Sequence, residues 1–161
     1  MASGSVLAPA CLLGSSLVDD EHTAPTEEAR QRAHELLDFL TPIIKTWPSE
    51  YGPRANYFAI QVLGGSGYVN EHPVEMMYRD NRLNPIHEGT TGIQSLDLLA
   101  RKVPQNGLAG YLACIAEMEA TISIAQEMPE LHGFADDLQG AIATLKQVTE
   151  FLLGSMMEKN I

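Results

Sequence analysis

The sequence has few positive charges, few aromatic residues and only two cysteines. Ten Lys and Arg residues stand against 21 Asp and Glu residues, which gives a formal net charge of −11. Proteins that bind the phosphate backbone carry clustered basic side chains, so we expect no nucleic-acid partner. No apolar run approaches the roughly 20 residues that a membrane-spanning helix needs, so we also expect no membrane span.

The cysteines and histidines do not form a metal-binding pattern. Cys11 and Cys114 lie far apart, each among apolar residues, which favours buried free thiols over a disulfide. The five histidines contain no pair at i,i+4 spacing. We therefore expect no metal site.

The sequence does have helical periodicity over most of its length. We expect a short first helix over residues 6–18 and a second one that follows an N-cap at Thr26. Pro42 should kink this second helix and Pro48 should end it. A third helix should begin at Pro53, which suits a first helical position, and should stop at two glycines.

The second half of the chain follows the same pattern. A short helix near Pro73 precedes a helix that is capped by Thr90 or Thr91 and reaches Val103. Two long helices follow a break at residues 104–107, and the second of them has heptad spacing. The loop near residues 129–133 between them indicates an antiparallel hairpin. The sequence therefore predicts an all-α fold: an up-and-down helical bundle over residues 6–103 and a C-terminal helical hairpin over residues 104–161.

Residues 61–94 are the stretch least typical of a plain helical core. They read QVLGGSGYVNEHPVEMMYRDNRLNPIHEGTTGIQ. The glycines at its start fit an ordinary helix stop, and they also fit close approach of a ligand to the backbone. From residue types alone, the stretch indicates a helical bundle that has a ligand loop.

Glu88 lies between Pro85 and Gly89, in a break between helices. A carboxylate that is held among apolar residues has its charged form disfavoured, which raises its pKa towards that of a useful general base. Residue type alone favours the alternative of a surface glutamate in a loop. Thr90 and Thr91 are more often helix caps than ligand contacts.

Two motifs in this stretch, QxxGGxGY and PVExxYRDxRxxxIxEGTxxIQ, resemble in order and spacing the C-terminal signature of the acyl-CoA dehydrogenase family. The resemblance runs from about residue 10 to residue 103 and is strongest to large members whose chains continue into a further helical segment. It implies an acyl-CoA substrate, FAD held across a homodimer or higher homo-oligomer, and an electron-transfer flavoprotein as acceptor. It also implies a bacterial cytoplasmic or a mitochondrial matrix location.

The resemblance gives each matched residue a role. Glu88 takes the position of the base that removes the α proton while the β carbon passes a hydride to the flavin, and the product is a trans-2-enoyl-CoA. Gly89 takes the position beside the substrate. Two sets match positions near FAD, and the first of them reaches the FAD of the neighbouring subunit: Gln61, Val62, Leu63, Gly64 and Gly65, and then Thr90, Thr91 and Gly92.

The sequence also departs from the family. His87 stands before the base, where many members have tyrosine, and this leaves the acyl chain length open. The N-terminal helical domain and the β domain of such enzymes are absent, so we expect a fragment that is inactive alone. An acyl-CoA oxidase or flavin monooxygenase relative remains an alternative, as does a non-catalytic helical dimerisation module.

Overall fold

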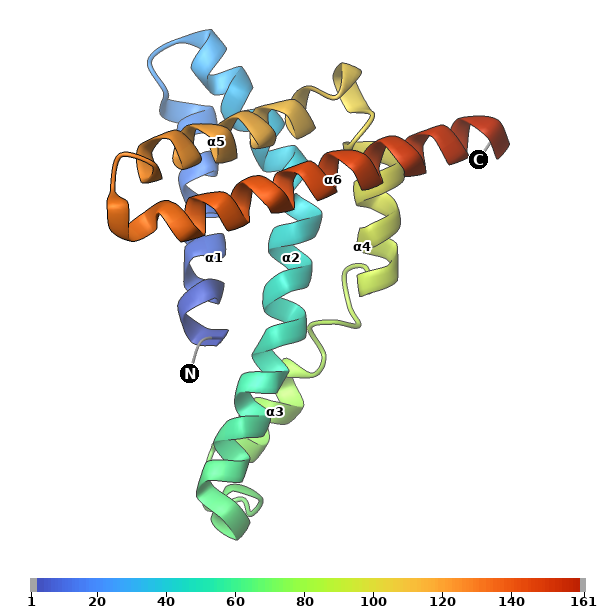
Figure 1. Cartoon of the computed structure of the whole chain (residues 1–161). Coiled ribbons are helices and arrows are strands. Elements are labelled where there is room, and N and C mark those ends of the chain that lie inside the picture. The colour runs from blue at the N-terminus through green and yellow to red at the C-terminus, as the bar shows by residue number, and fades with distance from the viewer. Residues whose placement is uncertain (1–2, 160–161) are drawn as a thin grey trace. The chain divides into compact units, whose positions relative to one another are not determined.

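The computed structural model describes residues 3–159 of the chain, and this range contains helices and no strand (Figure 1). The all-α prediction is confirmed. The chain divides into two compact units, Met1–Tyr111 and Leu112–Ile161. The domain boundary between residues 103 and 104 stays a prediction.

Two antiparallel helices, α1 (Ser3–Thr23) and α2 (Glu27–Leu63), form the centre of the first unit (Figure 1). Helix α1 is longer than the expected 6–18. Thr26 caps α2 as predicted, because its side chain accepts a hydrogen bond of 3.2 Å from the backbone N–H of Ala29. The two helices pack closely: a Cβ added at Gly14 would lie 3.1 Å from Ile44.

Helix α2 is continuous through three prolines, so the prediction that Pro48 ends it and that a third helix begins at Pro53 is wrong. A proline inside a helix removes one backbone hydrogen bond and costs about 3 kcal/mol. Pro42 and Pro53 are buried in this unit, and Ser49 adds a side-chain hydrogen bond of 2.6 Å to the carbonyl of Lys45. Tertiary packing thus outweighs local helix propensity here.

Helix α2 ends where the glycines predicted it would, and Gly64 adopts a φ of 60°. A 3₁₀ turn, η1 (Gly64–Gly67), then leads to α3 (Val74–Asn81), which begins directly after Pro73. Asn81 donates a 2.6 Å hydrogen bond to Asn56, so α3 lies back along the second half of α2.

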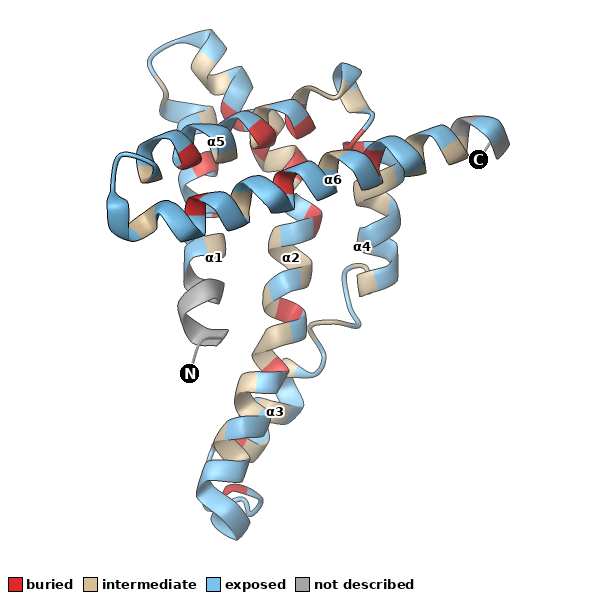
Figure 2. Cartoon of the chain, in the orientation of Figure 1, coloured by how far each residue is buried: buried red, intermediate tan, exposed pale blue. Residues whose placement is uncertain are grey.

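Helix α4 (Thr91–Asp97) continues into a π-helical turn, η2 (Leu98–Lys102), in which Val103 N–H bonds to Leu98 at 2.9 Å. The wider turn buries both Lys102 and Val103. The predicted break after Val103 is confirmed by the 3₁₀ turn η3 (Gln105–Gly107), where Asn106 has a positive φ. Buried residues of the first unit gather along α2 and this turn (Figure 2).

The second unit contains most of α5 (Ala109–Ala125), the short turn η4 (Pro129–Leu131) and α6 (His132–Lys159). An ion pair of 2.8 Å between Lys146 and Glu119 joins α6 to α5, as the predicted hairpin requires. By length and composition, Gln105–Ala125 could cross a membrane, although core helices of soluble proteins pass the same test. The described part of the chain thus contains one helix of membrane-spanning length and composition, contrary to the expectation that no apolar run approaches that length. The absence of a membrane span stays a prediction.

Both cysteines are free, but Cys11 is exposed, so its predicted burial is wrong. It lines an open pocket between α1 and α2, beside Thr41 and Ile44, and its apolar neighbours in the sequence do not cover it. Cys114 is partly buried, and this burial, together with the nearby charge of Glu117, raises the pKa of its thiol.

Candidate functional site

Glu88 lies in the loop between α3 and α4 with a backbone φ of 51°. This left-handed conformation is uncommon for a residue with a side chain and costs about 1–2 kcal/mol. Such strain persists only where the surroundings hold it in place, and it gathers at functional sites. The loop around Glu88 must therefore be anchored by other parts of the chain.

Helix α2 provides two anchors for this loop. The ammonium group of Lys45 donates to the backbone carbonyl of Gly89 and, at 3.0 Å, to that of Asn84. Further along α2, the carboxylate of Glu50 accepts a hydrogen bond from the hydroxyl of Thr91. The loop is thus tied to α2 on both sides of Glu88.

A third anchor comes from Gln94 in α4, whose amide donates a 3.0 Å hydrogen bond to the carbonyl of Glu88. Gly89 makes room for this amide, since a Cβ at Gly89 would lie 2.5 Å from Gln94 Nε2. Its φ of 89° also disfavours any residue other than glycine. The positive φ is therefore the constraint that favours glycine at the position that the family resemblance places beside the substrate, whereas the Gln94 amide lies at the end of a flexible side chain and could move aside.

Thr90 is the N-cap of α4, and its hydroxyl accepts a 3.4 Å hydrogen bond from the N–H of Ile93. The capping role is confirmed, whereas contact of Thr90, Thr91 and Gly92 with a flavin stays a prediction. Among the described residues, the nearest atom to a Cβ added at Gly92 is the hydroxyl oxygen of Thr90, 4.0 Å away, so the position is not crowded.

The other predicted cofactor segment, Gln61 to Gly65, lies at the exposed end of α2 and the start of η1. Val62 is 86% exposed. Gly64 has a positive φ, and Gly67 packs so closely that a Cβ would lie 2.9 Å from the carbonyl oxygen of Ile60. Gly65 has neither constraint and has open space around it.

The two predicted parts of the site do not meet within this chain. Both are placed by α2, but the Glu88 loop is tied to Glu50, whereas the other part begins at Gln61, eleven residues further along. At 1.5 Å per residue, that separation is roughly 16 Å along the helix axis. Figure 1 shows the end of α2 well away from the loop that leads into α4.

The structure does not supply the apolar surroundings that the sequence suggested for Glu88. Its side chain is exposed, and its neighbour Ile86 is 53% exposed and does not cover it. Residues that adjoin Glu88 in sequence point to solvent because the loop runs over the surface of α2. Within this chain, the alternative of a surface loop glutamate is the one observed.

Sequence reasoning missed the residues that hold this loop in place. Lys45, Ser49, Gly52 and Asn56 share one face of α2, at i,i+4,i+7,i+11 spacing. From this face, Lys45 contacts the loop, and Gly52 and Asn56 contact Asn81. The signal that could have revealed this face of α2 is a polar stripe at helical spacing beside the apolar one.

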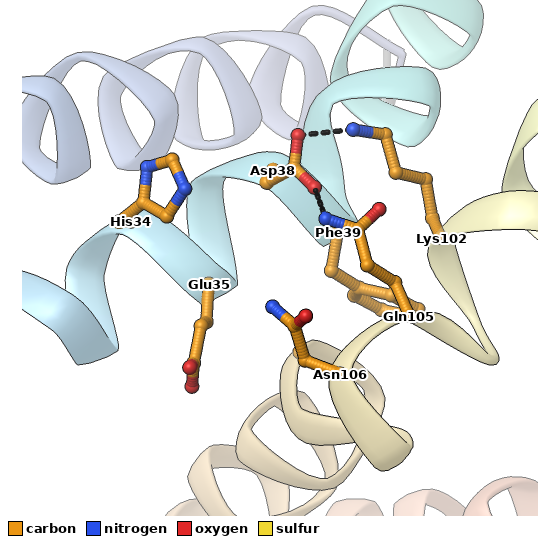
Figure 3. A pocket seen from close by; sticks show the side chains of 8 residues that line it. His34, Glu35, Asp38, Phe39, Lys102, Gln105 and Asn106 are labelled. Atoms are coloured by element: carbon orange, nitrogen blue, oxygen red, sulfur yellow. Dashed lines mark hydrogen bonds and ion pairs between the residues drawn. The ribbon is translucent and has the colours of Figure 1, made fainter.

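A second polar cluster lies nearer the start of α2. Lys102, whose side chain is 5% exposed, forms an ion pair with Asp38, and Gln105 donates a 2.9 Å hydrogen bond to the other carboxylate oxygen (Figure 3). Burial raises the pKa of Asp38, but the hydrogen bond and charge of Lys102, aided by Gln105, outweigh it and hold that pKa below its usual value.

The cavity beside this cluster measures about 10 Å³, room for at most one water molecule. The cluster is therefore a structural link between α2 and the turn after α4. Among residues 3–159, no three His, Cys, Asp or Glu side chains gather as metal ligands.

The fold and the loop define a helical domain that presents one strained glutamate and a glycine-rich turn at two exposed places. Residues 22–103, half of the chain, match the family described as "Acyl-CoA dehydrogenase, C-terminal domain". The chain belongs to the acyl-CoA dehydrogenase family.

Three relatives illustrate the similarity. The chain is 37% identical over 133 residues to the 3-methylmercaptopropionyl-CoA dehydrogenase of Ruegeria pomeroyi, covering 75% of this chain and 23% of that protein. It is 36% identical over 71 residues to a broad-specificity linear acyl-CoA dehydrogenase of Mycobacterium tuberculosis, covering 44% and 12%. It is 45% identical over 71 residues to the human mitochondrial short-chain specific acyl-CoA dehydrogenase, covering 40% and 17%.

The chain thus spans 12 to 23% of the length of these relatives. The Ruegeria match covers 75% of the 161 residues, which is more than the part up to Val103. The similarity to that protein therefore extends into the segment beyond the bundle.

Proposed function

We propose that this chain acts as the C-terminal part of an FAD-dependent acyl-CoA dehydrogenase, in which Glu88 removes the α proton of an acyl-CoA thioester. The observation that carries the proposal is the conformation of Glu88. The residue is held in a left-handed conformation by contacts on both sides, yet its carboxylate makes none of those contacts. A carboxylate that is positioned but unoccupied is suited to accept a proton.

The bound FAD would accept the hydride from the β carbon, and the chain's own glycines fit a flavin close by. Gly64, Gly67 and Gly89 are explained by the turn, packing or backbone conformation of this chain. Gly65 and Gly92 are not, because a side chain would fit at both. The absence of a side chain at these positions permits close approach of a group from outside the chain. Gly133, Gly140 and Gly154 have the same open space, so the family resemblance is what assigns Gly65 and Gly92 to the flavin.

We further propose that the two parts of the site serve two different active centres of a homo-oligomer. Their separation of roughly 16 Å along α2 supports this assignment, as do the exposed side chains near the glycine-rich turn. Val62 and Tyr68 are 86% and 81% exposed, and Phe58, Met76 and Met77 are exposed as well. An apolar surface of this kind is typical of a protein–protein contact, and we assign it to a second subunit.

The names of the relatives favour a dehydrogenase over an oxidase, since all three are called acyl-CoA dehydrogenases or act on a named acyl-CoA. We therefore propose an acyl-CoA substrate and an electron-transfer flavoprotein as acceptor. Peroxide released on addition of acyl-CoA would instead identify an oxidase.

The test is Glu88→Gln in the full-length, flavin-loaded enzyme. Because glutamine cannot take up the proton, kcat should fall by about 10²–10⁴-fold, the usual share of a general base. Turnover of butyryl-CoA, palmitoyl-CoA and 3-methylmercaptopropionyl-CoA would be measured with an artificial electron acceptor. Glu127→Gln, at an exposed glutamate in the turn after α5, is the matched control and should retain activity.

Full turnover by Glu88→Gln would contradict the assigned role. A full-length protein that forms a stable dimer but binds no flavin would contradict the whole proposal and support the helical dimerisation module.

A further inference from the structure

We infer that Lys45 is a positioning residue for Glu88, holding the loop in the geometry that proton abstraction needs. This inference rests on the proposed function. Lys45 lies on α2, outside the motifs that carry the family resemblance. Its ammonium group bonds only to backbone carbonyls of the loop. Its role therefore comes from geometry and not from contact with a substrate.

The two residues that Lys45 bonds lie on either side of Glu88 in the sequence. The ammonium group bonds to the carbonyl of Asn84 on one side of Glu88 and to that of Gly89 on the other. It thereby joins the two ends of a six-residue segment to a single point on a long helix. Hydrogen bonds from a charged donor are roughly twice as strong as neutral ones, and the partly buried position of Lys45 reduces competition from water.

The strained backbone at Glu88 explains why such an anchor is needed. With φ at 51°, the residue would gain by relaxing to negative φ, and that rotation would swing its carboxylate to a new position. Gln94 holds the carbonyl of Glu88 itself, but it lies on α4, the short helix that the loop leads into, so this bond joins two segments that are adjacent in the chain. Among these three anchors, the ones from α2 tie the loop to an element that does not move with it.

The other α2 anchor, Glu50, acts further from the base. It receives the hydroxyl of Thr91, three residues after Glu88 and already inside α4. It fixes where α4 begins, whereas Lys45 holds the carbonyl of Gly89, one residue after Glu88. The effect of removing Lys45 should therefore appear in the proton-transfer step itself.

The experiment compares Lys45→Met and Lys45→Arg in the full-length, flavin-loaded enzyme with butyryl-CoA. Methionine keeps the apolar stem and removes the donors, so kcat should fall by about 10–10²-fold while KM stays nearly constant, because misplacement by about 1 Å costs up to 10²-fold. The primary isotope effect with α-deuterated butyryl-CoA should rise, as proton abstraction becomes more rate-limiting. Arginine restores the donors and should recover part of kcat.

Ala33→Gly is the matched control, since Ala33 is buried on α2 twelve residues before Lys45, roughly 18 Å away along the helix axis, and glycine inside a helix costs about 1 kcal/mol. It should lower the thermal midpoint without changing the isotope effect. If Lys45→Met does not fold, Lys45→Gln replaces it, because glutamine is too short to reach both carbonyls.

A Lys45→Met enzyme that has normal kcat and a normal isotope effect overturns the inference. So does a fall in kcat that Ala33→Gly reproduces at equal loss of stability. Glu88→Gln distinguishes failure of the proposed function from failure of the Lys45 inference. If Glu88→Gln stays active, the proposed function is wrong. If Glu88→Gln is inactive while Lys45→Met is normal, only the role of Lys45 is wrong.

Discussion

Two lysines in the first unit differ in the groups that they bind. Lys102 is buried and faces the carboxylate of Asp38, with Gln105 completing the contact. Lys45 is partly buried and faces backbone carbonyls below an exposed loop. The first joins two elements through a charge pair, whereas the second shapes a stretch of backbone.

This difference predicts which property of the protein each lysine should affect when it is replaced. A buried ion pair has paid the desolvation of both charges, so removal of one partner leaves the other charge uncompensated. A lysine that bonds to neutral carbonyls leaves no charge behind when it is removed, and the loop can turn its carbonyls to water. We therefore expect Lys102 to matter mainly for stability and Lys45 mainly for the geometry of Glu88.

Lys102→Met should give the largest loss of stability. Breaking a buried pair costs about 3–5 kcal/mol, and we expect about 3 kcal/mol here because the Asp38 side chain is 29% exposed and partly solvated. Urea denaturation of the chain measures the free energy of unfolding. The double variant Asp38→Asn with Lys102→Met should recover most of the loss, since no charge is then left unpaired.

The distinction between the two lysines would be wrong if Lys45→Met lowered the free energy of unfolding as much as Lys102→Met does. The two lysines would then both be structural, and the assignment of Lys45 to loop geometry would lose its basis.

Gly89→Ala should have a smaller effect, at the loop itself. Alanine at a φ of 89° costs about 1–2 kcal/mol, and its Cβ would displace the Gln94 amide from the carbonyl of Glu88. Gly92→Ala is the control, because it lies in α4 with open space around it, where alanine should be neutral or slightly stabilising. Thermal unfolding of both variants checks the difference, and equal midpoints would show that the loop tolerates a side chain at residue 89.

The helices could be predicted from the sequence wherever a cap or a glycine fixed them locally. Thr26, Gly64 and Thr90 mark boundaries that the structure confirms. Pro48 misled the prediction because its cost is local, whereas the burial of Pro42 and Pro53 that offsets such costs depends on segments far away in sequence.

The site was predictable to the same extent. Glu88 and Gly89 could be found because their motif is continuous in sequence. Helical spacing could place Lys45 on a polar face of α2, but not its contact with the loop, and nothing marked Glu50, since both residues reach the loop across some forty residues of chain. The exposure of Glu88 was also not predictable from its neighbours, because whatever covers a loop need not adjoin it in sequence.

The smallest expected effect is a pH dependence of stability that comes from the Asp38–Lys102 ion pair and not from Lys45. The pKa of Asp38 is below its usual value in the folded chain, so its contribution to stability is complete above about pH 4, where the unfolded carboxyl is ionised, and is lost as the pH falls towards the folded value. The wild type should therefore lose stability below about pH 4 more steeply than Asp38→Asn does, in urea titrations across that range. Lys45 bonds to carbonyls, which do not titrate, so Lys45→Met should retain the wild-type slope. A slope that changes in Lys45→Met but not in Asp38→Asn would reverse the roles given to the two lysines, because the group that titrates would then lie at the loop.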